Sequence, residues 1–149
     1  MGANQSFLES LEWRRAVKHF GETDIDTEPI RTAIVAAPSS FGLQPYKVLA
    51  VKNRELKQLL QPACYDQCQI VECDTLFVFC TISKLATRAE EYISATGADS
   101  SRDMIMGFLN GLQDKRAWSA RQAYIALGFA MAAAAESKIL GRVSPDKAF

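Results

Sequence analysis

The chain has 149 residues, of which 48% are hydrophobic and 9% aromatic, so it is expected to fold as one domain and is not a disordered protein. Seventeen basic residues balance seventeen acidic ones, which excludes a protein that binds nucleic acid or anionic membranes through overall charge. The first residues show no signal peptide, and no apolar stretch reaches the roughly 20 residues of a membrane span. We therefore expect a cytoplasmic protein.

The N-terminal part predicts two helices. Ser6 and Glu9 have the spacing of a capping box, which predicts a helix over about residues 7–15. The polar stretch 21–27 is typical of a loop, and Thr27 is the expected N-cap of a second helix that ends at Pro38. The predicted buried stripe of this helix contains Ile30, Ala33, Ile34 and Ala37.

The middle of the chain predicts two strands and two short helices. Residues 46–51 are typical of a strand, and Asn53 is expected to cap a helix that runs to about Leu60. A further short helix is predicted over 65–72. The continuous apolar run 75–80 indicates a strand that is buried on both faces.

The C-terminal part predicts three helices, over 85–96, 103–112 and about 114–138. The last is apolar on nearly every side and rich in alanine, as expected of a central helix. The class is therefore α+β. Because two buried strands need neighbours, either further strands escape recognition or a partner chain completes the sheet, and a dimer is an attractive hypothesis.

The four cysteines, Cys64, Cys68, Cys73 and Cys80, are expected to be reduced thiols. They are separated by three, four and six residues, which is not the Cys-x-x-Cys spacing of a zinc site, and the single histidine, His19, lies far upstream. The sequence therefore predicts no metal site.

Two segments carry candidate chemistry. Arg14, Arg15 and Lys18 place three cations near the end of the first helix, where they either bind a phosphate or form a solvated basic helix end. The connection 37–46, with Ser39, Ser40 and a glycine between two prolines, either hydrogen-bonds a flat heterocycle or is an ordinary stiff connection.

Taken together and in order, these segments resemble the nitroreductase family of FMN-dependent, NAD(P)H-using oxidoreductases. The resemblance rests on Arg-Arg-x-x-Lys-x-Phe, then Ala-Pro-Ser-Ser-x-x-x-Gln-Pro-Tyr, then the stretches 65–71, 76–79 and 117–128. It covers about residues 7–140. It implies a nitroreductase-like α+β fold, with a central antiparallel sheet flanked by helices and a long central helix, in an intertwined homodimer with FMN at the subunit interface.

The resemblance also implies cofactor-binding residues. Arg14, Arg15 and Lys18 match positions around the FMN phosphate and the pyrimidine side of the ring, and Ala16 stands where many members have serine. The loop that reaches the flavin from the other subunit is matched by Pro38, Ser39, Ser40 and Gly42, the last in place of a usual asparagine. Asp66, Gln69 and Gln122 complete the set: Asp66 replaces a common asparagine, Gln69 matches a ring contact, and Gln122 matches a glutamine of the central helix.

A negative charge at Asp66 would disfavour the reduced, anionic flavin unless the acid is protonated or turned away. By the resemblance, the single domain 1–149 lacks the usual C-terminal strand and arm, and Arg142 is a candidate substitute for a cation of that region.

The implied function is hydride transfer from NAD(P)H through FMN to nitroaromatic or quinone-type acceptors. No side chain is expected to be catalytic, because the flavin carries the chemistry. Phe108 either lines the substrate side of the ring or is a core residue. The alternative function is a shortened, degenerate family member that holds flavin, or acts as an interaction protein, without efficient turnover.

Overall fold

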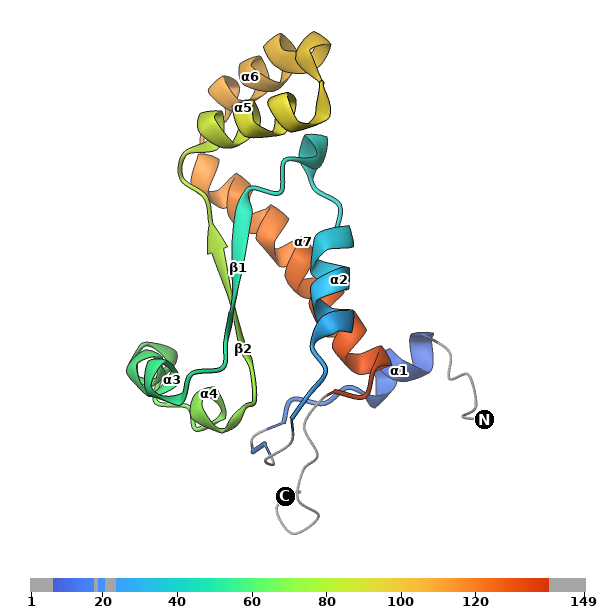
Figure 1. Cartoon of the computed structure of the whole chain (residues 1–149), viewed down its shortest axis with the longest axis vertical. Coiled ribbons are helices and arrows are strands. Elements are labelled where there is room, and N and C mark those ends of the chain that lie inside the picture. Colours follow the sequence, from blue (N-terminus) through green and yellow to red (C-terminus); the bar gives the residue numbers. More distant parts are fainter. Residues whose placement is uncertain (1–6, 18, 21–23, 140–149) are drawn as a thin grey trace.

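A computed structural model describes residues 7–17, 19–20 and 24–139 of the chain. The predictions for Ser6, Lys18 and Arg142 lie outside these residues. Helices dominate the described part, with 3-10 turns (η) between them, and Figure 1 shows their arrangement. In chain order the elements are α1 (Phe7–Trp13), α2 (Glu28–Ala36), η1 (Ser40–Gly42), β1 (Tyr46–Val51), α3 (Arg54–Leu60), η2 (Gln61–Cys64), α4 (Gln69–Glu72), β2 (Leu76–Thr81), α5 (Leu85–Thr96), η3 (Asp99–Ser101), α6 (Arg102–Gly111) and α7 (Lys115–Glu136).

The sheet of the described residues has two strands. β1 and β2 pair antiparallel, with Tyr46 opposite Thr81 and Val51 opposite Leu76. This confirms the positions of both predicted strands. The prediction that the second strand is buried on both faces was wrong: Leu76 to Cys80 are half-buried and Thr81 is exposed, because the sheet of the described residues has no further strand to cover it. The connection between them holds α3, η2 and α4, which lie at the far end of the strand pair from α5 and α6 (Figure 1).

The long helix α7 organises the first of two core clusters. Its small side chains allow α2 to pack closely on it, and the apolar face of the sheet packs there too. The buried members of this cluster are Ile30, Ile34, Ala37, Tyr46, Ala123, Ala126, Ala130 and Ala134. The alanine-rich sequence therefore produces the central helix that was predicted.

The second core cluster lies around α5 and α6. These helices pack on each other, on the loop that follows α2, and on Trp118 near the start of α7. Its buried members are Leu43, Leu85, Ala89, Ile93, Ile105, Leu109 and Trp118. The loop between α2 and β1 is thus held against the core by Leu43, which is almost fully buried.

Two predicted boundaries were wrong, and one predicted cap lacks its side-chain hydrogen bond. The first helix ends at Trp13, so Arg14 and Arg15 follow it and are not part of it. Thr27 is the N-cap of α2 as predicted, but its side chain makes no capping bond; the Asp26 carboxylate accepts a hydrogen bond from the Glu28 N–H at 3.0 Å. The predicted helix over 65–72 is only Gln69–Glu72, because Tyr65 and Asp66 have positive φ angles of 57° and 54° and end the preceding turn.

Candidate functional site

The loop between α2 and β1 is fixed by its own hydrogen bonds. The Ser39 hydroxyl accepts a bond from the Gln44 N–H at 2.8 Å, and the Gln44 side-chain amide donates to the Val35 carbonyl at 2.8 Å. Phe41 and Gln44 have positive φ angles of 56° and 42°, so the backbone turns sharply here. The loop 37–46 therefore has one defined conformation, and its role toward a cofactor stays a prediction.

Gln122 joins this loop to the central helix. Its side chain is 7% exposed, and its Oε1 accepts a hydrogen bond from the Ser40 N–H at 3.0 Å. The two residues are 82 positions apart in the sequence. The structure thus brings together two residues that the resemblance assigns to the cofactor site, and Gln122 acts by positioning the loop.

Gly42 fits its place in this loop because it has no side chain. Its φ is +73°, and a Cβ at this position would lie 3.1 Å from the Tyr92 hydroxyl. Any other residue would therefore combine a strained backbone with a close contact. The asparagine expected from the resemblance would meet both obstacles here.

An aromatic row lies beside the loop. The Phe41 ring contacts the Phe108 ring edge-on at 5.2 Å between centroids, and Phe108 contacts Trp118 in the same way at 5.8 Å. Phe108 is 38% exposed, while Trp118 is buried. Phe108 is therefore a partly exposed residue at the edge of the second core cluster, and its role toward a substrate stays a prediction.

The predicted phosphate-binding segment lies elsewhere in the chain. Arg14 is half-buried, Arg15 and Ala16 are exposed, and the Arg15 guanidinium donates to the Glu12 carbonyl at 2.6 Å. From α1 the chain runs to α4, where the Phe20 N–H donates to the Glu72 carboxylate at 3.1 Å. The chain that follows Arg14 and Arg15 therefore contacts α4 at Phe20.

Asp66 and Gln69 belong to this α4 region. Asp66 is exposed, and its backbone is held by hydrogen bonds with Gln61 in both directions. Gln69 is half-buried, and its side-chain oxygen accepts a bond from the Cys68 thiol at 3.6 Å.

The candidate residues thus lie in two separate regions. The loop group comprises the loop 38–42 and Gln122. The α4 group comprises Asp66 and Gln69, and Arg14, Arg15 and Ala16 follow α1 and precede the Phe20–Glu72 contact with α4. In Figure 1 the loop lies beside α5 and α6, while α4 lies at the opposite end of the strand pair. One copy of the chain does not bring the two groups to one point.

Sequence reasoning missed Lys57. This lysine is 4% exposed in α3, and its ammonium donates to the backbone carbonyls of Cys73 and Asp74, the latter at 3.4 Å. It therefore ties α3 to the chain that leaves α4. Nothing in the sequence pattern distinguishes it from an exposed lysine, because burial of its head group depends on those distant carbonyls.

Sequence reasoning also missed an apolar groove of about 460 Å³ between β2, η2 and α7. Its size is in the range of small-molecule pockets. It is lined by Leu60, Cys64, Leu76, Phe77, Val78, Phe79, Thr81, Ala120, Ala123, Tyr124 and Leu127. None of these side chains is charged and none is a predicted flavin contact, so the groove is not suited to a phosphate group.

Two weakly acidic side chains, the half-buried Cys73 thiol and the buried Tyr46 hydroxyl, have raised pKa values. Burial raises the pKa of the Cys73 thiol above its ordinary 9.0, because desolvation outweighs the nearby Lys57 charge. Burial likewise raises the pKa of the Tyr46 hydroxyl above 10.0, against the opposing effect of its hydrogen bond with Gln44. Both groups are therefore neutral at pH 7.

Known proteins share this fold and sequence pattern. The model of the Nitroreductase family matches residues 11–140, and the chain belongs to this family. A Staphylococcus epidermidis protein provisionally named an NAD(P)H nitroreductase is 24% identical over an alignment 152 residues long. The alignment includes 89% of this chain and 69% of that protein.

Solved structures agree on the fold. The Nitroreductase Family Protein of Streptococcus pneumoniae has a TM-score of 0.72 at 24% identity, covering 89% of this chain and 72% of that one. A provisionally named nitroreductase of Exiguobacterium sibiricum, in complex with FMN, has a TM-score of 0.74 at 19% identity, covering 89% and 70%. The nitroreductase-like fold is therefore confirmed. Within the described residues, no helix combines the length and the apolar character needed to cross a membrane.

Proposed function

We propose that this protein is an FMN-dependent oxidoreductase that transfers a hydride from NAD(P)H to nitroaromatic or quinone-type acceptors. The observation that carries the proposal is the family match along residues 11–140, in a fold shared with an FMN-bound structure. The contact between Gln122 and Ser40 supports it, because it shapes the loop that the resemblance assigns to the flavin.

The residues present fit FMN chemically. A phosphate is best bound by guanidinium groups, and Arg14 and Arg15 offer two in adjacent positions on a largely exposed segment. The edges of a flavin ring need hydrogen-bonding groups, which the Gln69 amide and the Ser40 hydroxyl supply. Asp66 is exposed, so its carboxylate can point to solvent and need not oppose a reduced ring.

FMN, when bound, supplies the hydride chemistry, and the protein positions it. Arg14 and Arg15 would hold the phosphate, and Gln69 would orient the ring edge. Gln122 would keep the loop 38–42 in one conformation, so that the loop covers the ring without losing entropy at each binding event.

A homodimer is part of the proposal. The loop group and the α4 group lie at opposite ends of one chain, so a second copy is needed to bring them together around one flavin. Exposed apolar side chains on α7 support this arrangement: Tyr124 is 72% exposed, Phe129 42% and Ile125 40%. Apolar side chains gathered on one helix in this way are typical of an interface.

Titration of the purified protein with FMN, followed by NADH or NADPH without oxygen, tests the proposal. We expect bound flavin whose blue absorbance bleaches on addition of the nicotinamide. Protein that binds no FMN would refute the proposal. Flavin that binds but is not reduced by either nicotinamide would favour the alternative, a flavin-holding protein.

Arg14→Ala makes the test specific to the predicted phosphate contact. Loss of a charge-assisted bond costs about 1.5–3 kcal/mol, so FMN affinity should fall by about 10- to 150-fold. The matched control is Arg31→Ala, because Arg31 is exposed on α2 and pairs with Glu28 at 3.9 Å. Equal affinities for the two variants would place the phosphate away from Arg14.

A further inference from the structure

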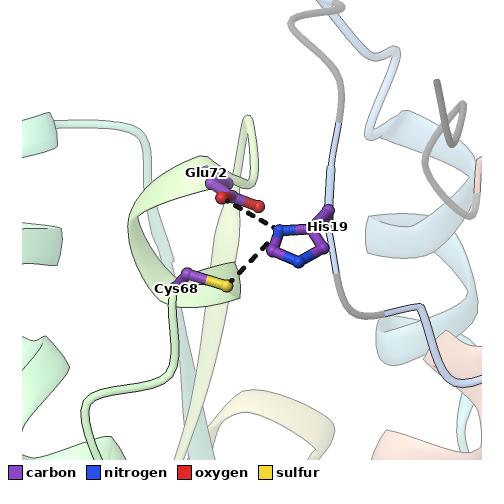
Figure 2. A group of neighbouring side chains, drawn as sticks. All are labelled: His19, Cys68 and Glu72. Atoms are coloured by element: carbon purple, nitrogen blue, oxygen red, sulfur yellow. Dashed lines mark hydrogen bonds and ion pairs between the residues drawn. The ribbon is translucent and has the colours of Figure 1, made fainter. Parts of the chain in front are cut away.

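Three side chains that can bind metals converge between α4 and the segment after Arg15. His19 Nδ1 lies 3.3 Å from Glu72 Oε1 and 3.7 Å from Cys68 Sγ. The three ligand atoms all lie within 4.8 Å of one another. Figure 2 shows the imidazole facing both other side chains across the gap between the two segments.

Both contacts involve the same imidazole nitrogen. A proton relay would need Cys68 at one ring nitrogen and Glu72 at the other, because each nitrogen holds a single proton or lone pair in the ring plane. Here the carboxylate oxygen and the sulfur both face Nδ1. The arrangement therefore suits a cation shared by the three atoms and does not suit a Cys–His–Glu catalytic triad.

The separations match those of a tetrahedral zinc site. With Zn–N and Zn–O bonds of about 2.0–2.2 Å, the nitrogen and oxygen are about 3.3–3.5 Å apart, and a Zn–S bond of about 2.3 Å gives about 3.6 Å between nitrogen and sulfur. The observed 3.3 Å and 3.7 Å lie within about 0.2 Å of these values. Cys68 Sγ and the Glu72 oxygen lie within 4.8 Å of each other, and theirs is the one separation that would change when the ion binds.

The backbone already holds the ligands in place. Cys68 and Glu72 lie one helical turn apart, and the Glu72 N–H donates to the Cys68 carbonyl at 3.0 Å. Glu72 Oε2 accepts the Phe20 N–H at 3.1 Å, which orients the carboxylate so that Oε1 faces His19. Such hydrogen bonds to the non-ligating atom are the usual support of metal-binding carboxylates.

The donor set selects the metal. A thiolate, an imidazole and a carboxylate suit Zn²⁺, whereas Mg²⁺ and Ca²⁺ require oxygen ligands. The thiolate and carboxylate together neutralise the two positive charges of the ion. Three protein ligands leave the fourth tetrahedral position for water.

We propose that His19, Cys68 and Glu72 form a Zn²⁺ site that fastens the segment after Arg15 to α4. Since Arg14 and Arg15 precede His19 and Gln69 follows Cys68, the ion would fix the relative positions of these three predicted flavin contacts. The site itself does not depend on FMN, and it is tested on flavin-free protein.

Co²⁺ titration of the reduced, flavin-free protein tests the site, because cobalt replaces zinc in tetrahedral sites and reports its ligands by absorbance. We expect one Co²⁺ per chain, a thiolate-to-cobalt charge-transfer band in the near ultraviolet, and loss of the band when Zn²⁺ is added. Metal binding should release the thiol proton, so the apparent affinity should rise with pH.

Variants decide between a built site and adventitious binding. Cys68→Ser should abolish the charge-transfer band. His19→Ala and Glu72→Gln should each weaken binding by at least about a hundredfold, because loss of a supporting residue that is not itself a ligand already costs about 10- to 100-fold. Cys64→Ser is the matched control and should bind like the unaltered protein, since Cys64 is not one of the three ligands. Circular dichroism checks that each variant folds.

Two results would overturn the proposal. One is the absence of a charge-transfer band in the folded, reduced protein at Co²⁺ concentrations well above its own. The other is a band that Cys64→Ser and Cys68→Ser reduce equally, which would indicate nonspecific thiol binding.

Discussion

The hydrogen bond between Gln122 and Ser40 gives a direct test of how the loop between α2 and β1 is held. Gln122→Leu keeps a side chain of similar size but removes the acceptor, so the Ser40 N–H loses its partner in a partly buried place. An orphaned donor of this kind costs about 1–3 kcal/mol. For a chain of this length, each kcal/mol lowers the melting temperature by about 2–4 °C, so we expect a fall of about 2–12 °C.

Two assays follow this substitution. Thermal denaturation measures the global effect, and amide hydrogen exchange at Ser40 measures the local one, since the unbonded amide should exchange faster. Gln58→Leu is the control, because Gln58 is exposed on α3 and its replacement should change stability by at most about 0.5 kcal/mol. Equal melting temperatures for the two variants, with Ser40 still protected, would refute the role given to Gln122.

Three further predictions concern stability. In urea denaturation, Gly42→Ala should lower the free energy of unfolding by about 1–2 kcal/mol, because residue 42 has a positive φ. Gly107→Ala should raise it by up to about 1 kcal/mol, because Gly107 lies within α6 with open space around it. Ser119→Ala should leave stability unchanged or raise it by about 1 kcal/mol by calorimetry, since the buried Ser119 hydroxyl has no hydrogen-bond partner among the described residues; a clear loss would reveal a partner. Burial raises the pKa values of Cys73 and Tyr46, so the unfolded chain loses these protons at lower pH than the folded protein does, and the free energy of unfolding should be constant below about pH 9 and fall above it. Tyr46→Phe should flatten the upper part of that fall, and an unchanged pH profile in this variant would contradict the raised pKa of Tyr46.

Local chemistry made part of the fold predictable. Asn53 caps α3 by accepting the Leu56 N–H at 2.8 Å, and Asp114 caps α7 by accepting the Ala117 N–H at 2.8 Å. Both bonds depend only on residues three positions apart, which a sequence displays directly. The apolar run at 75–80 located β2 to within one residue, because an unbroken run of apolar, aromatic and β-branched residues is typical of a strand.

The features that were missed depend on contacts between distant segments. His19 lies beside Cys68 although 49 positions separate them, so cysteine spacing could give no sign of their meeting. The break at Tyr65 and Asp66 was missed because neither residue is a glycine, and nothing local marks the left-handed turn.

In the proposed dimer, two copies of the chain enclose each FMN, one with its arginines and the other with its serine loop. Mixing two defective proteins tests this arrangement: Arg14→Ala/Arg15→Ala impairs the first contribution, and Gln122→Leu impairs the second. If subunits exchange freely in an equal mixture, half of the dimers are mixed and each regains one intact site, so FMN binding should return to about one quarter of the sites. A mixture that binds no more FMN than the average of the two separate variants would contradict a site shared between copies.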